Sequence, residues 1–269
     1  VLTWGAAGSW DDAQVAMAWV ILDTLTSTYR MWYTGADIDN SGIGYATSPV
    51  VLNVPGNYQT IQAAIDSASD GNIVLVEEGT YYENINFKGK AITVASHFLV
   101  DGDTSHISNT IIDGSQPSNP DSGSVVYFIS GEDTNSVLKG FTITGGLGTY
   151  HSPQPVRTGG GILILSGGKL ENNEILQNQI TVSTNTYAHG AGLSVQSEKN
   201  VVIRNNLVAY NTIDGWWGGG AGMLLACSDT TSILFDKNIL KGNVYNANNG
   251  LCSGGAFIGA ESGWQGQIT

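Results

Sequence analysis

The segment IRNNLVAYN at residues 203–211 has close counterparts in LENNEILQN at residues 170–178 and FDKNILKGN at residues 235–243. In each segment Asn follows the leading hydrophobic residue after three positions, and a second Asn follows five positions later. The segment VLKGFTITG at residues 137–145 fits the same frame, with Gly140 and Gly145 at the two Asn positions. Repetition of one pattern in successive units predicts a solenoid in which each unit forms one coil.

Clusters of small residues mark a second position of the same repeat. Each cluster immediately precedes a hydrophobic residue, and these residues are Ile162, Leu193, Met223 and Phe257. The segments between the clusters are short, rich in β-forming residues and without a helical period. Gly and Asn tolerate left-handed backbone conformations, so we expect each coil to turn a corner there. The pattern predicts a parallel β-helix whose stacked Asn residues belong to the scaffold.

The beginning of the solenoid is also recognisable. Ile61, Ala64, Ile65 and Ala68 are spaced to lie on one face of a short helix, which Gly71 ends. The segment NIVLV at residues 72–76 then begins the first coil. Because the end of a solenoid exposes apolar core and unpaired strand edges, we expect this helix to cap the coil stack.

These features resemble two known families. The stretch Val54–Ser96, with the Gly and Asn repeats after it, resembles the right-handed parallel β-helix of the pectin-lyase-like superfamily. The segment YRMWYTGADIDNSGIGYATSP at residues 29–49 resembles one blade of the five-bladed β-propellers of several glycoside hydrolase families. The resemblance implies an all-β chain, with a blade-like segment over residues 1–50 and a right-handed β-helix over residues 51–269.

Composition excludes several classes of partner. The net charge is −13 with only ten Lys and Arg residues, which argues against nucleic acid, whose phosphates require clustered cations. No apolar run approaches the roughly 20 residues of a membrane span. The acidity, the few Lys residues and the abundant Asn, Ser, Thr and Gly favour a secreted protein. Cys227 and Cys252 are equally compatible with one disulfide and with two buried thiols.

The catalytic motifs of the polygalacturonases on this fold are absent from the sequence. NTID at residues 211–214 and AHGAG at residues 188–192 are near matches that lie in a different context. The signatures of family-one pectate lyases and of pectin methylesterases are also missing. The resemblance therefore indicates a polysaccharide partner without identifying the reaction.

We expect irregular loops between each second Asn and the next small-residue cluster, and these loops form one wall if the coils stack. Aromatic side chains beside polar ones suit sugar rings, whose C–H faces stack while their hydroxyls form hydrogen bonds. The substrate-binding candidates are Tyr150, Tyr187, Trp216, Trp217 and Tyr245. The candidates for acid, base or anion-binding roles are His151, Arg157, His189 and Asp214. The alternative is that the aromatic residues only pack on the flank of the β-helix.

Two hypotheses for function follow. One is a secreted polysaccharide lyase or glycoside hydrolase that uses this wall as its groove, and the other is a non-catalytic, adhesin-like glycan-binding module. Calcium is the one candidate cofactor, with Asp101, Asp103 and Asp113 as candidate ligands, and a polyanionic glycan would need calcium bridges to this acidic protein. No helix or charged segment follows the last small-residue cluster, so we expect the C-terminal coil to be continued or covered by a partner copy.

Overall fold

The computed structural model describes residues 14–23, 28–36, 41–151, 155–227, 231–247, 253–258 and 267–268. The chain divides into two compact units, Val1–Val50 and Val51–Thr269. The first unit contains a three-stranded antiparallel sheet in the order β1-β2-β3. Its strands are β1 (Gln14–Asp23), β2 (Thr28–Ala36) and β3 (Ser41–Thr47). The assignment of this sheet to a propeller family stays a prediction.

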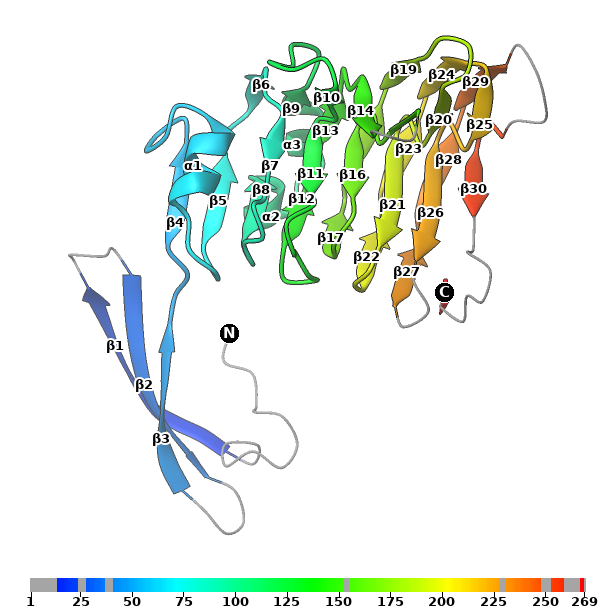
Figure 1. The fold of residues 1–269 in the computed structure, drawn as a ribbon. Helices are drawn as coiled ribbons and strands as arrows, with labels where there is room; N and C mark the ends of the chain where they lie inside the picture. The colour runs from blue at the N-terminus through cyan, green and yellow to red at the C-terminus, as the bar shows by residue number, and fades with distance from the viewer. Residues whose placement is uncertain are drawn as a thin grey trace. The chain divides into compact units, whose positions relative to one another are not determined.

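The second unit is a parallel β-helix, as predicted, with three long sheets that run along the coil stack (Figure 1). Sheet I consists of β4 (Val51–Val54), β5 (Ile73–Val76), β8 (Thr93–Ser96), β12 (Val137–Lys139), β17 (Gly168–Glu171), β22 (Val201–Arg204), β27 (Ser232–Asp236) and β31 (Gln267–Ile268). Sheet II consists of β6 (Gly79–Tyr81), β9 (Thr110–Asp113), β13 (Thr142–Thr144), β18 (Glu174–Leu176), β23 (Leu207–Ala209) and β28 (Ile239–Lys241). Sheet III consists of β7 (Ile85–Asn86), β11 (Val126–Phe128), β16 (Ile162–Ile164), β21 (Leu193–Ser197), β26 (Met223–Cys227) and β30 (Ala256–Ile258).

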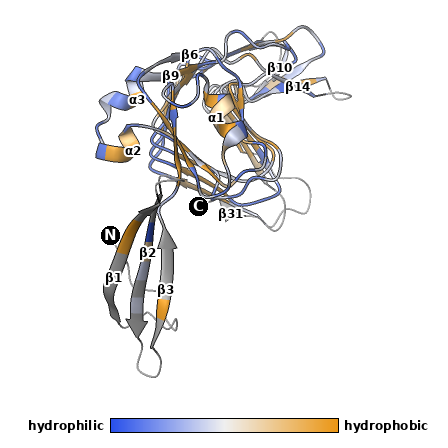
Figure 2. Cartoon of the chain, turned by 90° about the vertical axis from the view of Figure 1, so that its left-hand side faces the viewer, coloured by the Kyte–Doolittle hydropathy of each residue, from blue (hydrophilic) through white to orange (hydrophobic). Residues whose placement is uncertain are grey.

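The core of the β-helix is built from stacked aliphatic side chains. On sheet II the register aligns Ile112, Ile143, Ile175 and Val208, and each of these side chains is fully buried. Figure 2 shows the hydrophobic residues concentrated on the inside of the coils. Burial of each such side chain contributes roughly 1.5–3 kcal/mol to the free energy of unfolding. The repeat therefore produces one continuous core along the stack.

The predicted capping helix is α1 (Ile61–Ser67), which lies across the end of the coils (Figure 2). Ile61, Ala64, Ile65 and Ala68 are all buried against the core, as the spacing predicts. Two further short helices, α2 (Phe98–Asp101) and α3 (Ser105–Asn109), lie between β8 and β9. In the described part of the chain, no helix is long and apolar enough to cross a membrane.

The Asn residues form two ladders along the corners on either side of sheet II. Asn173, Asn206 and Asn238 form the first ladder, and Asn178, Asn211 and Asn243 form the second. Within each ladder the side-chain amide donates to the Oδ1 atom of the next Asn at 3.0 Å. These Asn residues satisfy backbone groups that the corner removes from the sheets, which agrees with a scaffold role.

The corner itself differs by one residue from our expectation. The left-handed conformation belongs to the residue before each ladder Asn, for example Asn172 (φ 56°) and Asn205 (φ 56°). Leu138 pairs with Leu170 in the sheet, so Gly140 corresponds to Asn172 and not to Asn173. Gly145 also lies before the ladder position, because its φ of 73° is the left-handed conformation found there.

The predicted alignment of the small-residue clusters is confirmed for three coils and wrong for one. Ile162 pairs with Leu193, and Leu193 pairs with Met223. In the last coil Met223 pairs with Ala256, so Phe257 lies one position beyond the predicted alignment. A shift of one residue exchanges the two faces of a strand, and Phe257 accordingly points outward with 44% of its surface exposed.

Candidate functional site

The segments predicted to form a wall do lie together, and much of their described length forms short strands rather than irregular loops. They form two further sheets between sheets II and III. Sheet IV consists of β10 (Ser122–Gly123), β14 (Gly148–His151), β15 (Val156–Thr158), β20 (Tyr187–His189) and β25 (Trp217–Gly219). Sheet V consists of β19 (Gln179–Thr181), β24 (Thr212–Gly215) and β29 (Val244–Ala247). The alternation of apolar and polar residues in the QITV segment at 179–182 was the available signal for strand structure.

A small second core joins the two outer sheets. Ile180 and Ile213 of sheet V are fully buried with Ala188 of sheet IV. Val182 and Tyr245 pack against this cluster and are partly buried. Tyr245 is therefore a packing residue, which corresponds to the flank-packing alternative for this side chain.

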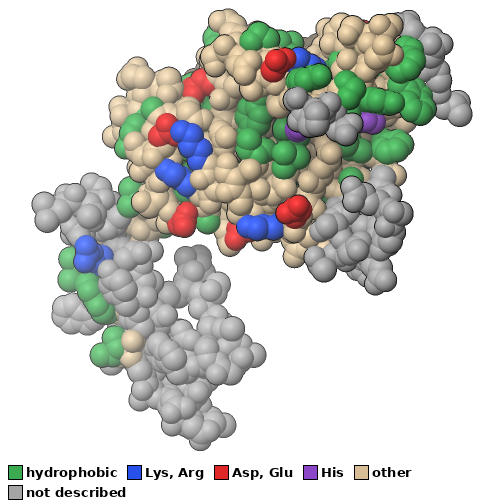
Figure 3. Space-filling model, viewed as in Figure 1, with side chains coloured by type: hydrophobic (Ala, Val, Ile, Leu, Met, Phe, Trp, Pro, Cys, Tyr) green, Lys and Arg blue, Asp and Glu red, His purple; other side chains and the backbone are tan. Residues whose placement is uncertain are grey.

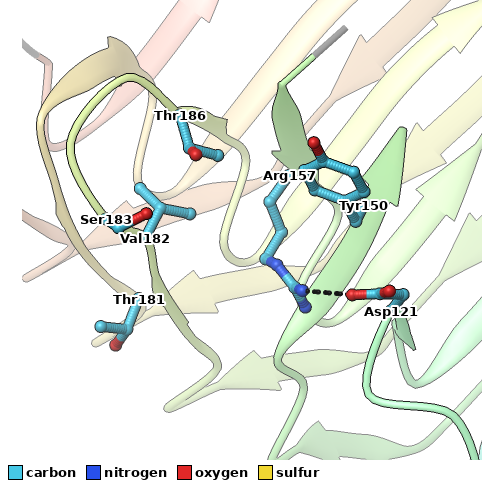
Figure 4. Close-up of a pocket in the computed structure, with 7 residues that line it drawn as sticks. All are labelled: Asp121, Tyr150, Arg157, Thr181, Val182, Ser183 and Thr186. Carbon is cyan, nitrogen blue, oxygen red and sulfur yellow. Dashed lines mark hydrogen bonds and ion pairs between the residues drawn. The ribbon is translucent and has the colours of Figure 1, made fainter. Parts of the chain in front are cut away.

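A cavity of about 370 Å³ opens between sheet IV and the segment that follows β19 (Figure 4). On one side it is lined by Asp121, Tyr150 and Arg157. On the other side it is lined by Thr181, Val182, Ser183 and Thr186. We call this space the Arg157 cavity. It combines an aromatic ring, one ion pair and three hydroxyl groups, which is a surface suited to hydrogen-bonding a polyhydroxylated ligand.

Hydrogen bonds hold Arg157 firmly in the wall of the cavity. Its Nη1 atom donates to the carbonyl oxygens of Pro120 and Gly148, both at 2.9 Å. Its Nη2 atom donates to Asp121 Oδ1 at 3.0 Å. Tyr150 lies directly opposite Arg157 in the β14–β15 pair, so the two side chains project from the same face of sheet IV. The structure thus brings two of the predicted residues together.

Both predicted histidines lie on the other face of sheet IV. His151 adjoins Tyr150 in β14, and its Nε2 atom lies 3.0 Å from the hydroxyl of Thr158. Thr158 and His189 are partners in the register of β15 and β20, so His189 shares this face. Burial lowers the pKa of both histidines, which keeps them neutral near pH 7. These rings are therefore separated from Arg157 by the sheet.

Asp214 is placed in a ladder of polar side chains on sheet V. Gln179 Nε2 donates to Asp214 Oδ2, and Asn246 Nδ2 donates to Asp214 Oδ1, both at 2.6 Å. Asp214 adjoins the buried Ile213, so its side chain projects from the opposite face of the strand. It does not line the Arg157 cavity. This geometry gives Asp214 two hydrogen-bonding partners within the scaffold.

Two of the aromatic candidates, Tyr187 and Trp217, lie on the histidine face of sheet IV and not on the face of Arg157. Tyr187 and Trp217 are partners in the register of β20 and β25, and their ring centroids are 5.6 Å apart at 48°. Trp217 is 49% exposed, and Trp216 is half-buried. These two tryptophans do face different environments, since neighbouring residues of an extended segment project to opposite sides.

The three candidate calcium ligands accept hydrogen bonds from groups of the protein. Asp101 and Asp103 accept from backbone N–H groups two residues further on, as does Asp113. Asp101 also contacts His106, with its Oδ2 atom 3.1 Å from Nε2. Among the described residues, no group of three or more His, Cys, Asp or Glu side chains could hold a metal ion. Cys252 and the side chain of Cys227 lie outside the described residues, so their pairing stays open.

Four polar cavity residues, and Val182 beside them, escaped prediction from the sequence. Asp121 lies 36 positions before Arg157, and no local pattern connects the two. Thr181, Ser183 and Thr186 belong to a predicted wall segment, where the hydroxyl-rich TVSTNT motif at residues 181–186 was an available signal. Comparison of the chain with protein-family models and with curated proteins gives no match.

Proposed function

We propose that this chain is a secreted β-helix protein of the pectin-lyase-like type that binds a polysaccharide at the Arg157 cavity. The observation that carries the proposal is the convergence of Tyr150, the Arg157–Asp121 pair and three hydroxyl side chains on one open cavity (Figure 4). A sugar ring presents C–H faces to an aromatic side chain and hydroxyl groups to polar side chains.

The geometry favours binding over cleavage. Hydrolysis of a glycosidic bond generally uses two carboxyl groups roughly 5–10 Å apart on either side of the bond. Asp121 is the only carboxylate among the residues that line the cavity, and it is paired with Arg157. The non-catalytic glycan-binding hypothesis is therefore the form of the proposal that we favour, and cleavage by a lyase or hydrolase is the alternative.

The test is retardation of the protein in native gels that contain plant and algal polysaccharides, followed by isothermal titration with oligosaccharides of each retarding type. We expect at least one polysaccharide to retard the protein, and Tyr150→Ala to reduce the retardation. Tyr82→Ala is the matched control, because Tyr82 is an exposed tyrosine next to β6 and does not line the cavity. Failure of every polysaccharide to bind would refute the proposal.

Products of prolonged incubation distinguish binding from cleavage. New reducing ends would indicate a hydrolase, and new unsaturated ends that absorb in the ultraviolet would indicate a lyase. We expect neither product from any polysaccharide that binds. Release of either product, abolished by Arg157→Ala or Asp214→Ala, would replace the binding proposal by the enzymatic alternative.

A further inference from the structure

We infer that the Arg157 cavity selects an uncharged saccharide over an acidic one. This inference rests on the proposed function, and it specifies the chemical class of the ligand. It follows from the charges and the exposure of the ion pair that Arg157 and Asp121 form in the cavity. Arg157 and Asp121 are the one cation and the one anion among the lining residues, so the cavity is neutral as a whole.

The two charged groups differ strongly in exposure. The Arg157 side chain is 18% exposed, whereas the Asp121 side chain is 68% exposed. A ligand that enters the cavity therefore meets the carboxylate before the guanidinium. An acidic sugar would be repelled by this carboxylate and by the net charge of −13 on the protein.

Three of the five N–H donors of Arg157 are committed to the protein. Two donors reach the carbonyl oxygens of Pro120 and Gly148, and a third reaches Asp121. Recognition of a carboxylate or a sulfate by Arg normally uses two parallel N–H donors. Freeing the donor that reaches Gly148, a buried residue, would leave its carbonyl oxygen without this partner, at a cost of about 1–3 kcal/mol. An anion that used the committed donors would bind Arg157 only at this cost.

An uncharged hydroxyl group avoids the repulsion from the Asp121 carboxylate. It can donate to the exposed Asp121 carboxylate, while Thr181, Ser183 and Thr186 donate to or accept from its neighbours. The ring of Tyr150 supplies the apolar surface for the sugar's C–H face.

The experiment compares xylan and mixed-linkage glucan as neutral ligands with polygalacturonate as an acidic ligand. Affinities are measured by titration with oligosaccharides between about 0.01 M and about 1 M salt, over which the Debye length falls from about 30 Å to about 3 Å. We expect binding of a neutral glycan with an affinity that does not change with salt. Asp121→Asn should weaken this binding about tenfold or more, because a hydrogen bond to a charged group is lost.

The variants separate a cavity role from a structural one. Asp121→Asn conserves the shape of the side chain, and thermal unfolding checks that the fold is retained. Tyr82→Ala should leave the affinity for the neutral glycan unchanged. Unimpaired binding of that glycan by both Asp121→Asn and Tyr150→Ala would overturn the inference.

The outcomes also separate this inference from the proposed function. Preferential binding of polygalacturonate would overturn the inference and leave the proposed function standing. Binding of no glycan from either class would overturn both.

Discussion

Single asparagines stabilise the corners of this β-helix through several hydrogen bonds each. Asn206 is 2% exposed, and its Nδ2 atom donates to the carbonyl oxygens of Leu170 and Arg204. Its Oδ1 atom accepts from the backbone N–H of Asn173 at 2.9 Å. One side chain thus satisfies groups from three successive coils, counting its link to Asn238.

Asn206→Ala should lower the free energy of unfolding by about 2–4 kcal/mol, because buried donors and acceptors lose their partner. Denaturant titration measures this change. The control is Asn205→Gly, since Asn205 is exposed and already left-handed with φ 56°, a conformation that Gly adopts without strain. Equal destabilisation by the two variants would contradict a ladder role for Asn206.

Among single residues, His106 carries a predictable dependence of stability on pH. Hydrogen bonds to Asp101, and then to Glu78, raise the pKa of His106. A raised pKa means that the stabilisation is complete below the unfolded value of about 6.5 and is lost as the pH rises through the folded value. Asp103 and the His97 ring, whose centroid is 5.9 Å away, also face this residue.

We expect His106→Gln to lower the Tm most at about pH 5–6, with the difference from the natural sequence disappearing at higher pH. His189→Gln provides the contrast, because burial lowers the pKa of His189. A lowered pKa makes the natural sequence lose stability relative to that variant as the pH falls below about 6.5. A His106→Gln difference that did not depend on pH would refute this assignment.

At the scale of elements, helix α1 is capped by the first coil. Glu83 accepts from the backbone N–H groups of Ile61 and Gln62, both at 2.9 Å, at the start of the helix. Lys90 Nζ donates to the carbonyl oxygens of Ile65, Asp66 and Ala68 at its end, each at 2.7 Å. An anion at the N-terminus and a cation at the C-terminus both match the helix dipole. These contacts hold the helix on the end of the stack.

Lys90→Met should lower the free energy of unfolding by about 1–2 kcal/mol, because carbonyl groups at the helix end lose a charged donor. Lys88→Met is the matched control. Lys88 pairs with Asp66 at the surface, where the two side chains are 51% and 46% exposed, and such pairs contribute about 0–1 kcal/mol. Denaturant unfolding of both variants checks the prediction, which a larger effect at Lys88 would contradict.

The small-residue clusters allow neighbouring backbones to approach closely. A Cβ atom added at Gly161 would lie 2.6 Å from the carbonyl oxygen of Gly192 and 2.9 Å from Asn178 Nδ2. Gly161→Ala should therefore destabilise the protein by about 1–3 kcal/mol through overpacking. Gly255→Ala is the control, because a Cβ atom there would meet nothing within 4 Å. Comparable thermal stabilities of the two variants would disprove the close-approach explanation.

At the scale of the whole molecule, a solenoid stabilises each coil through its neighbours, so the two ends of the stack differ from the middle. Figure 3 shows charged side chains scattered on the face that it views, with hydrophobic ones gathered between them. Ile239 of β28 and Ile258 of β30 are 60% and 59% exposed. These strands belong to the last described coil, where the expected contact with a partner copy would lie.

If a second copy covers this coil, sedimentation at graded concentrations should show a dimer that dissociates on dilution. Ile258→Lys should shift the protein toward the monomer, since burial of an unpaired charge opposes association. Ile43→Lys is the control, because Ile43 is 75% exposed and belongs to the first unit. A protein that stays monomeric at all concentrations would refute self-association.

The sequence by itself determined the coil architecture, because the period, the ladder Asn residues and the aliphatic rows are local patterns that repeat. It also located the capping helix, whose apolar spacing is contained within eight residues, Ile61 to Ala68. The single-residue offset at Gly140 could not be settled in this way, because Gly and Asn both accept a left-handed corner.

Only the tertiary structure decided which side chains share the candidate site. Strand alternation in sheet IV sends Tyr150 and Arg157 to one face and His151 and His189 to the other. Asp121 reaches Arg157 because β10 pairs with β14, a contact between segments distant in the sequence. Which residues meet at a cavity depends on such non-local pairing, and a pattern within one repeat unit carries no information about it.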